Sequence, residues 1–173
     1  PTDDEARRTA WAVLAAALAA LGVKKGDRVA IFMPNIPQFV IAYYGILKAG
    51  GVVVASNPTY TVPELQHQLK DSGAKIILCM SRFYGTVKQV LPHTDIKTVI
   101  VTNIKDYMGG LLRLLFSLAK EKKSGDRVTL EPGHLSFMDL LAKYTPAQRP
   151  KVTVTGNDSA LFQYSGGTTG VPK

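Results

Sequence analysis

The sequence has one cysteine, and its three histidines stand far apart. Cys79 lies in the apolar run 75–80, so no intrachain disulfide can form and no cysteine-rich metal site can be built. His67, His93 and His134 lack the spacing of metal ligands, and we expect each in a loop or on the surface. These shortages exclude disulfide-stabilised small folds and agree with a reducing compartment.

Acidic residues are also scarce. Thirteen Asp and Glu stand against 21 Lys and Arg, which gives a formal net charge of +8. A basic balance can indicate nucleic acid, an anionic membrane surface or a phosphate-rich ligand. The basic residues are spread out, with one modest concentration between Arg113 and Arg127, and no nucleic-acid motif accompanies them. We therefore interpret the charge mainly as a solvated surface and expect no nucleic-acid partner.

Long hydrophobic runs are missing, although two segments resemble membrane signals. Arg7-Arg8 and the run Ala10–Leu21 resemble a signal peptide, but three acidic residues precede them and the run is mostly alanine, which favours a packed helix. The leucine-rich run 111–119 is too short to cross a bilayer, which needs about 20 residues. With its lysines, Leu111–Lys123 suits a peripheral membrane contact or a helix packed on the rest of a parent protein.

The clearest pattern is an alternation of short β-rich runs with helical runs. Thr61, Pro63 and Glu64 form the start signal of one such helix. Because the strand runs are almost continuously apolar, they should be buried on both faces and pair in parallel. The sequence predicts an α/β fold, a layered and mostly parallel sheet with flanking helices. Expected strands are 28–33, 52–55, 76–80 and 99–101, and expected helices are 37–48, 61–71 and 83–91.

We interpret residues 1–173 as part of one domain with three sections. Residues 1–102 form the β/α sheet, and 103–151 leave the sheet as an excursion that includes a short helix from Ser136 to Lys143. Residues 152–173 return as a strand near 159–164 and end in a loop rich in glycine and threonine.

This terminal loop has the composition of a phosphate-binding segment. Glycines allow backbone N–H groups to approach a phosphate, and hydroxyl and lysine side chains can bind its oxygens or a magnesium ion. Pro172 before Lys173 distinguishes the loop from the usual P-loop, whose lysine follows glycine. Composition alone leaves two interpretations, a phosphate cradle or a flexible connection.

The segment Tyr164–Lys173 resembles the signature of the AMP-forming acyl-CoA synthetase and luciferase superfamily of adenylate-forming enzymes. The resemblance extends from about residue 6 to 173, is weakest over 103–151, and includes 22–30, 33–35, 48–51, 57–61 and 64–75. Within the superfamily, 163–167 and the leucine-rich basic segment most resemble long-chain fatty acid–CoA ligases of bacteria and archaea.

The resemblance implies the N-terminal part of the acetyl-CoA synthetase-like fold. It also implies an enzyme that uses ATP and Mg²⁺ to convert a carboxylic acid into an acyl-adenylate, and then coenzyme A to form acyl-CoA. Thr168 stands where the family coordinates magnesium. The positions expected to bind the β- and γ-phosphates of ATP are Ser165, Gly166, Gly167, Thr168, Thr169, Gly170 and Lys173.

The resemblance places no catalytic residue within the chain. In the family, the adenine contacts, the second magnesium ligand and the catalytic lysine follow position 173, so we expect residues 1–173 alone to bind ATP weakly and to be inactive. Two alternative substrates stay open, an aromatic acid such as a coumarate and a medium-chain acid. The alternative function is a nucleotide-binding module without catalysis. The expected location is the cytoplasm, with peripheral contact at the inner face of the membrane.

Overall fold

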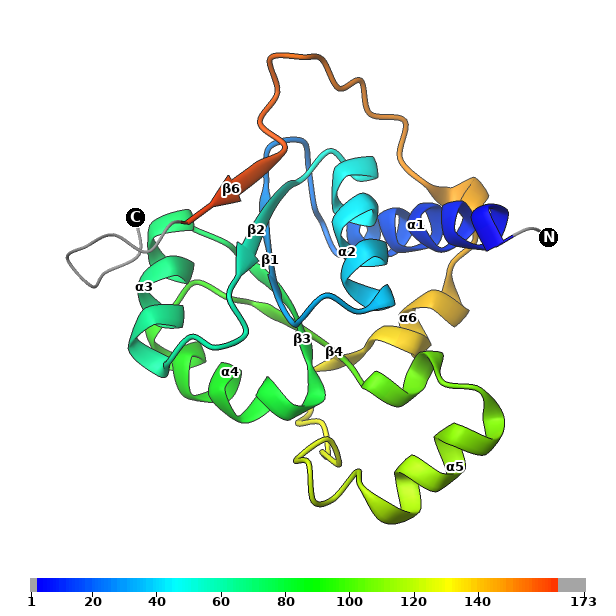
Figure 1. The fold of residues 1–173 in the computed structure, drawn as a ribbon. Helices are drawn as coiled ribbons and strands as arrows, with labels where there is room; N and C mark the ends of the chain where they lie inside the picture. The colour runs from blue at the N-terminus through cyan, green and yellow to red at the C-terminus, as the bar shows by residue number, and fades with distance from the viewer. Residues whose placement is uncertain (1–2, 165–173) are drawn as a thin grey trace.

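The computed structural model describes residues 3–164, which form a six-stranded, fully parallel sheet (Figure 1). The predicted α/β class and the parallel pairing are confirmed. The strand order is β5-β4-β3-β1-β2-β6. The strands are β1 (Arg28–Phe32), β2 (Val52–Ser56), β3 (Ile76–Met80), β4 (Thr98–Thr102), β5 (Leu135–Ser136) and β6 (Leu161–Gln163).

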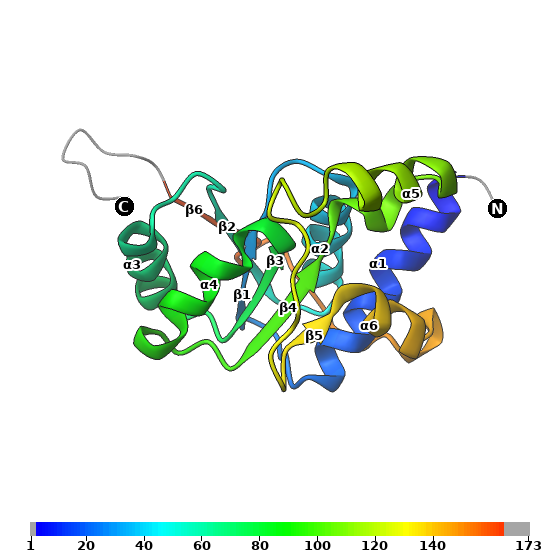
Figure 2. The same cartoon turned by 90° about the horizontal axis from the view of Figure 1, so that it is seen from below.

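Helices cover both faces of the sheet (Figure 2). On one face lie α1 (Asp3–Ala20), α2 (Pro37–Lys48) and α6 (Phe137–Lys143), and on the other lie α3 (Val62–Ser72) and α4 (Tyr84–Val90). Neighbouring strand residues alternate between the two cores. In β1, Ile31 packs with α1 and α2, whereas Phe32 packs with α3 and α4, as the pleat of a strand requires.

Local signals place the helix ends correctly. Thr61 and Glu64 form the predicted capping box of α3, and Gly73 ends this helix at φ +63°, a conformation that glycine adopts without strain. Ser136 caps α6 by accepting a hydrogen bond from the Asp139 amide. The alanine-rich run lies in α1 and packs into the core, as expected for a structural helix. Within residues 3–164, no helix is long and apolar enough to cross a membrane.

The structure differs from the sequence predictions in one place. The stretch 103–151 is not wholly an excursion, since Leu135 pairs in parallel with Ile100 and adds β5 to the sheet edge. β5 has only two residues, and so short a strand has no apolar run from which it could be predicted. The strand expected near 159–164 is present as β6, and all three of its residues are exposed.

The histidines lie where they were expected. His67 and His93 are exposed, and His134 is partly buried beside Tyr84, whose hydroxyl forms a hydrogen bond with its Nδ1. Cys79 is fully buried in β3, as its apolar run predicted.

Candidate functional site

A hollow of about 560 Å³ opens at the carboxyl ends of β1, β2 and β6. The segment after β1 leads to α2 on one face of the sheet, and the segment after β2 leads to α3 on the other. In open parallel sheets, ligands bind in the crevice that such diverging connections create. Its polar lining comprises Asn35, Ser56, Asn57, Tyr60, Glu64, Gln163 and Tyr164.

Ser56, the last residue of β2, supplies unused hydrogen-bonding capacity in this hollow. It is buried, and its Oγ has no hydrogen-bond partner among the described residues. A buried polar atom without a partner is costly and rare. The side-chain oxygen of the next residue, Asn57, is engaged, because Oδ1 accepts from the Thr59 amide at 3.0 Å and from the Thr59 hydroxyl at 2.8 Å. The turn is therefore ordered locally, and the Ser56 hydroxyl stays available for a group that enters the hollow.

Glu64 lines the hollow, but its carboxylate already serves α3. The amide and the hydroxyl of Thr61 each donate to Glu64 Oε2 at 2.7 Å, and these hydrogen bonds lower the pKa of Glu64. Tyr60 shows the opposite shift, since burial and then the charge of Glu64 raise its pKa. At neutral pH the lining thus offers a protonated phenol, which can donate a hydrogen bond to an acidic ligand.

Tyr164 is the last described residue and lies directly before the predicted phosphate loop. Its hydroxyl donates to Asp71 Oδ2 at the end of α3, and its ring packs against the core that α3 and α4 cover. Burial, followed by the hydrogen bond to Asp71, raises the pKa of Tyr164 and keeps it protonated. Since Gln163 pairs with Ala55, the chain passes Ser56 as it leaves β6.

Polar contacts also hold the segment that precedes β6, residues 155–160. Asp158 accepts from the Thr155 amide at 2.6 Å and forms an ion pair with Lys25 at 2.8 Å. The hydrogen bond from Lys25 and those from Thr155 lower the pKa of Asp158 to about 2. The amide of Val53 then donates to the carbonyl of Ala160 at 2.9 Å, so β6 begins in register beside β2.

The predicted phosphate and magnesium residues lie outside the described residues, and their roles stay predictions. They are Ser165, Gly166, Gly167, Thr168, Thr169, Gly170 and Lys173. Within residues 3–164, no group of three or more His, Cys, Asp or Glu side chains could hold a metal ion. Apart from the Glu64 carboxylate, which accepts from Thr61, the oxygen ligands of the hollow are hydroxyls and amides. They fit a magnesium ion only when substrate phosphates and water complete its oxygen shell.

Two residues gained no role from the sequence: Ser56, which lines the hollow, and Asp71, which binds the Tyr164 hydroxyl beside it. Ser56 could have been noticed as a hydroxyl at the carboxyl end of a buried apolar strand. Asp71 could have been noticed because it stands in the last turn of a helix, where the helix dipole disfavours negative charge. Only the folded chain places Asp71 next to Tyr164, which lies 93 residues further along.

Comparison with known proteins places this chain in a known family. The family model for AMP-binding enzymes matches residues 8–173. The long-chain-fatty-acid–CoA ligase of Yersinia pestis is 42% identical over 155 residues, which cover 88% of this chain and 27% of that protein. The 4-coumarate–CoA ligase 2 of Oryza sativa subsp. japonica is 34% identical over 166 residues, 92% of this chain and 26% of that protein.

A solved structure agrees with these relatives. The long-chain-fatty-acid-CoA ligase from Archaeoglobus fulgidus superposes with a TM-score of 0.71 at 27% identity, covering 95% of this chain and 27% of that one. The chain thus spans about a quarter of the length of the proteins that it matches. The matching family model covers nearly the whole sequence, and the parallel sheet agrees with it, so the chain belongs to the AMP-binding enzyme family.

Proposed function

We propose that the parent protein of this chain activates a long-chain fatty acid with ATP and then joins it to coenzyme A. One observation carries the proposal. The chain enters the signature Tyr164–Lys173 from the carboxyl end of β6, beside a hollow in which the Ser56 hydroxyl has no hydrogen-bond partner among residues 3–164. A phosphate-binding loop that starts at this edge would deliver its donors to the place where parallel sheets bind ligands.

The proposed reaction has two steps. A carboxylate oxygen attacks the α-phosphorus of ATP and the bond to pyrophosphate breaks, which leaves acyl-adenylate. The thiolate of coenzyme A then attacks the acyl carbon and AMP departs. Charge develops on the phosphates in the first step, so backbone N–H groups, hydroxyls and Lys173 would stabilise it. Thr168 would help to hold Mg²⁺, which supplies further charge neutralisation when bound.

The proposed phosphate contacts can be tested in the parent enzyme. Lys173→Gln and Thr168→Val should each lower the rate of pyrophosphate release by about a hundredfold, the usual effect of losing one preorganised donor. Lys97→Gln serves as the control, because Lys97 is exposed and lies outside the hollow. Rates that stay within about twofold of the wild type in both loop variants would refute the assignment.

The acyl substrate needs its own measurement. The Yersinia pestis relative supports a long-chain fatty acid, and the rice relative supports an aromatic acid. We expect the parent enzyme to prefer palmitate to 4-coumarate and octanoate when kcat/KM is compared. A preference for either of the other two acids would replace the long-chain assignment. Binding of ATP without any acid-dependent pyrophosphate release would indicate a nucleotide-binding module instead.

We also propose that residues 1–173 are inactive alone, and that the parent enzyme works in the cytoplasm with peripheral contact at the membrane through Leu111–Lys123. The described hollow contains no residue expected to catalyse either step. Purified 1–173 should therefore release no pyrophosphate above background with ATP and palmitate. Formation of acyl-AMP by this chain would contradict the proposal.

A further inference from the structure

Helix α5 (Gly110–Ala119) turns its apolar side away from the protein. Figures 1 and 2 both place it at the periphery, outside the two layers that cover the sheet. None of its residues is buried. At 100° per residue, its leucines fall within an arc of about 160°. Their exposed fractions are 73% for Leu111, 65% for Leu112, 56% for Leu114, 53% for Leu115 and 77% for Leu118.

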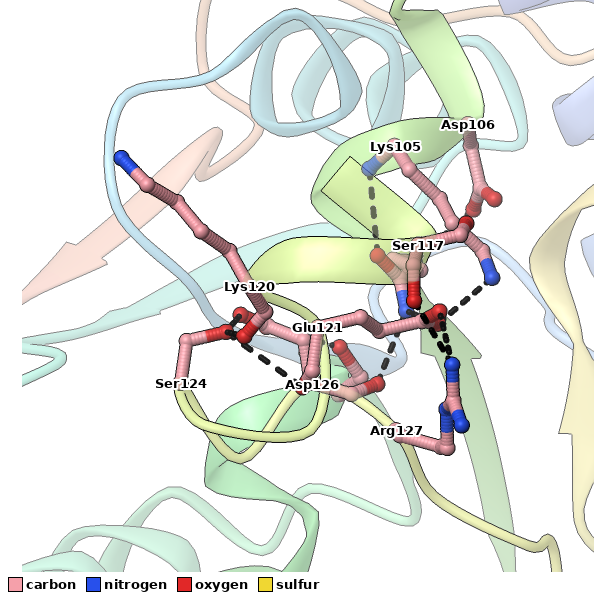
Figure 3. Close-up of polar contacts among 10 residues, drawn as sticks. Lys105, Asp106, Ser117, Lys120, Glu121, Ser124, Asp126 and Arg127 are labelled. Atoms are coloured by element: carbon pink, nitrogen blue, oxygen red, sulfur yellow. Dashed lines mark hydrogen bonds and ion pairs between the residues drawn. The ribbon is translucent and has the colours of Figure 1, made fainter. Parts of the chain in front are cut away.

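The opposite side of α5 holds the helix on the protein. Ser117 lies on this side, and its carbonyl accepts a hydrogen bond from Arg127 Nη2 at 2.7 Å. Glu121 follows the helix, is buried, and pairs with Lys105 and with Arg127 (Figure 3). Burial alone would raise the pKa of Glu121, but Lys105 and Arg127 hold it below its usual value. Rotation of α5 to bury the leucines would break these contacts.

A second buried carboxylate fixes the segment that follows. Asp126 accepts hydrogen bonds from Arg82 Nη2 at 2.7 Å, from Ser81 at 3.0 Å and from Ser124 at 2.6 Å. The Asn103 side chain adds a bond to the Asp126 carbonyl at 2.8 Å. The outward direction of the leucines is therefore set by a fully partnered polar network and not by a loose attachment.

On the surface of residues 110–127, all exposed charged side chains are basic. Its two acidic residues, Glu121 and Asp126, are buried and paired with cations. Lys120, Lys122 and Lys123 are exposed and form no ion pair with the described residues. Figure 3 shows Lys120 directed away from the network. A leucine face bordered by exposed lysines, with the two acidic side chains buried, is complementary to a partner whose interior is apolar and whose surface is anionic.

We propose that α5 and the lysines after it form a docking surface for an anionic lipid bilayer, with the leucines in the acyl layer and the ammonium groups at the headgroups. Interfacial helices combine an aliphatic face with lysine and arginine in this way. A protein partner fits less well, because protein interfaces concentrate their binding energy in Trp, Tyr and Arg and not in leucine. The inference extends the membrane contact proposed above and does not depend on the ligase chemistry.

The test measures binding to vesicles, which is independent of catalysis. The 173-residue chain and the parent enzyme are sedimented with phosphatidylglycerol–phosphatidylcholine vesicles and with pure phosphatidylcholine vesicles. Both proteins should bind the anionic vesicles more tightly, and binding should weaken as salt rises. Failure of the chain to bind either vesicle would overturn the proposal. Binding by the chain but not by the parent enzyme would also overturn it, since the rest of the enzyme would then cover the helix.

Variants separate the two parts of the surface. Leu111→Ser with Leu118→Ser should weaken binding by on the order of tenfold, because these are the most exposed leucines. Val154→Ser, an exposed apolar residue elsewhere on the chain, should have no effect. A loss of vesicle binding in Val154→Ser equal to that in the leucine double variant would refute a role for α5. Far-UV circular dichroism of each variant should match the wild type, since none of these side chains is buried.

The lysines are tested in the same assay. Lys120, Lys122 and Lys123 replaced together by Gln should remove most of the preference for anionic vesicles, whereas Arg113→Gln, on the other side of α5, should cost much less. If the lysine variant keeps the full preference, the proposal fails. A dimer seen by sedimentation velocity, lost in the leucine variant and accompanied by no vesicle binding, would show that a second copy covers the helix instead.

Discussion

Replacing Asp126 by alanine should lower the free energy of unfolding more than the same replacement of any exposed acidic residue. The Asp126 side chain has no exposed surface and accepts four hydrogen bonds. Two of them come from Arg82, at 2.7 and 3.4 Å. Alanine would leave the buried Ser81 hydroxyl without its acceptor and Arg82 without its counter-ion.

The size of the effect follows from what is left behind. Breaking a buried ion pair by removing one partner costs about 3–5 kcal/mol. Arg82 is 39% exposed and can recover some hydration, so we expect a loss of about 3 kcal/mol in the free energy of unfolding. For a chain of this length that corresponds to a fall in Tm of about 6–12 °C. Urea unfolding followed by circular dichroism measures the free energy, and a thermal scan measures Tm.

The pH dependence gives an independent check. Burial alone would raise the pKa of Asp126, but hydrogen bonds from Arg82 and the two serines bring it below its usual 3.8. A carboxyl whose pKa is lower in the folded state stabilises the fold above its unfolded pKa and loses that contribution as the pH falls through its folded pKa. The cost of Asp126→Ala should stay constant from about pH 7 to 5 and shrink below about pH 4.

Asp95→Ala is the matched control, because Asp95 is exposed, and it should change stability by less than about 0.5 kcal/mol. A cost for Asp126→Ala no larger than that of the control would show that the buried network contributes nothing. A cost that stays the same at pH 3 would show that its origin is not the ionised carboxylate.

Three further predictions use other parts of the structure. Gly45→Ala should destabilise the chain by about 1–3 kcal/mol, because a Cβ there would lie 2.9 Å from the Cβ of Leu14, whereas Gly85→Ala, with nothing within 4 Å, should stabilise it by up to about 1 kcal/mol; urea unfolding compares the two. Cys79 is fully buried and its pKa is raised by that burial, so it should resist a thiol reagent until guanidinium unfolds the chain. Tyr164→Phe should slow pyrophosphate release by the parent enzyme severalfold while Tm changes little, because the lost hydrogen bond holds the entrance of the phosphate loop; an unchanged rate would refute that role.

Local features of the sequence predicted the elements well, because their causes are local. Thr61 and Glu64 begin α3 and Gly73 ends it, and each acts on backbone groups within a few residues. The mostly apolar runs 28–32, 52–56 and 76–80 are almost wholly buried on both faces, which is typical of parallel strands beneath helices. The sheet class followed from these runs without knowledge of the strand order.

What the sequence did not reveal depends on distant residues. Nothing within Leu161–Gln163 indicates that β6 pairs with β2 across the sheet from β5. The direction of the leucines in α5 could not be predicted either, since Lys105 and Arg127 impose it from outside the helix. The phosphate residues Ser165–Lys173 were recognised by resemblance, and their arrangement stays a prediction.

The segments that carry the two proposed surfaces, α5 and the phosphate loop, both follow strands at the carboxyl end of the sheet. All strands are parallel, so the chain leaves β4 toward α5 at the same end of the sheet, the carboxyl end, where it leaves β6 toward the phosphate loop. The two strands are four positions apart, roughly 19 Å. We propose that a bilayer that holds α5 faces this end of the sheet, so that a fatty acid dissolved in it can reach the hollow.

This arrangement predicts a selective effect of membranes on the parent enzyme. Anionic vesicles should raise kcat/KM for palmitate supplied in the bilayer, but should leave the rate with water-soluble butyrate unchanged, because butyrate does not partition into the acyl layer. Leu111→Ser with Leu118→Ser should remove the rise and preserve the butyrate rate, since neither leucine lines the hollow. If vesicles accelerate both acids equally, membrane contact acts on the enzyme itself and not on substrate delivery.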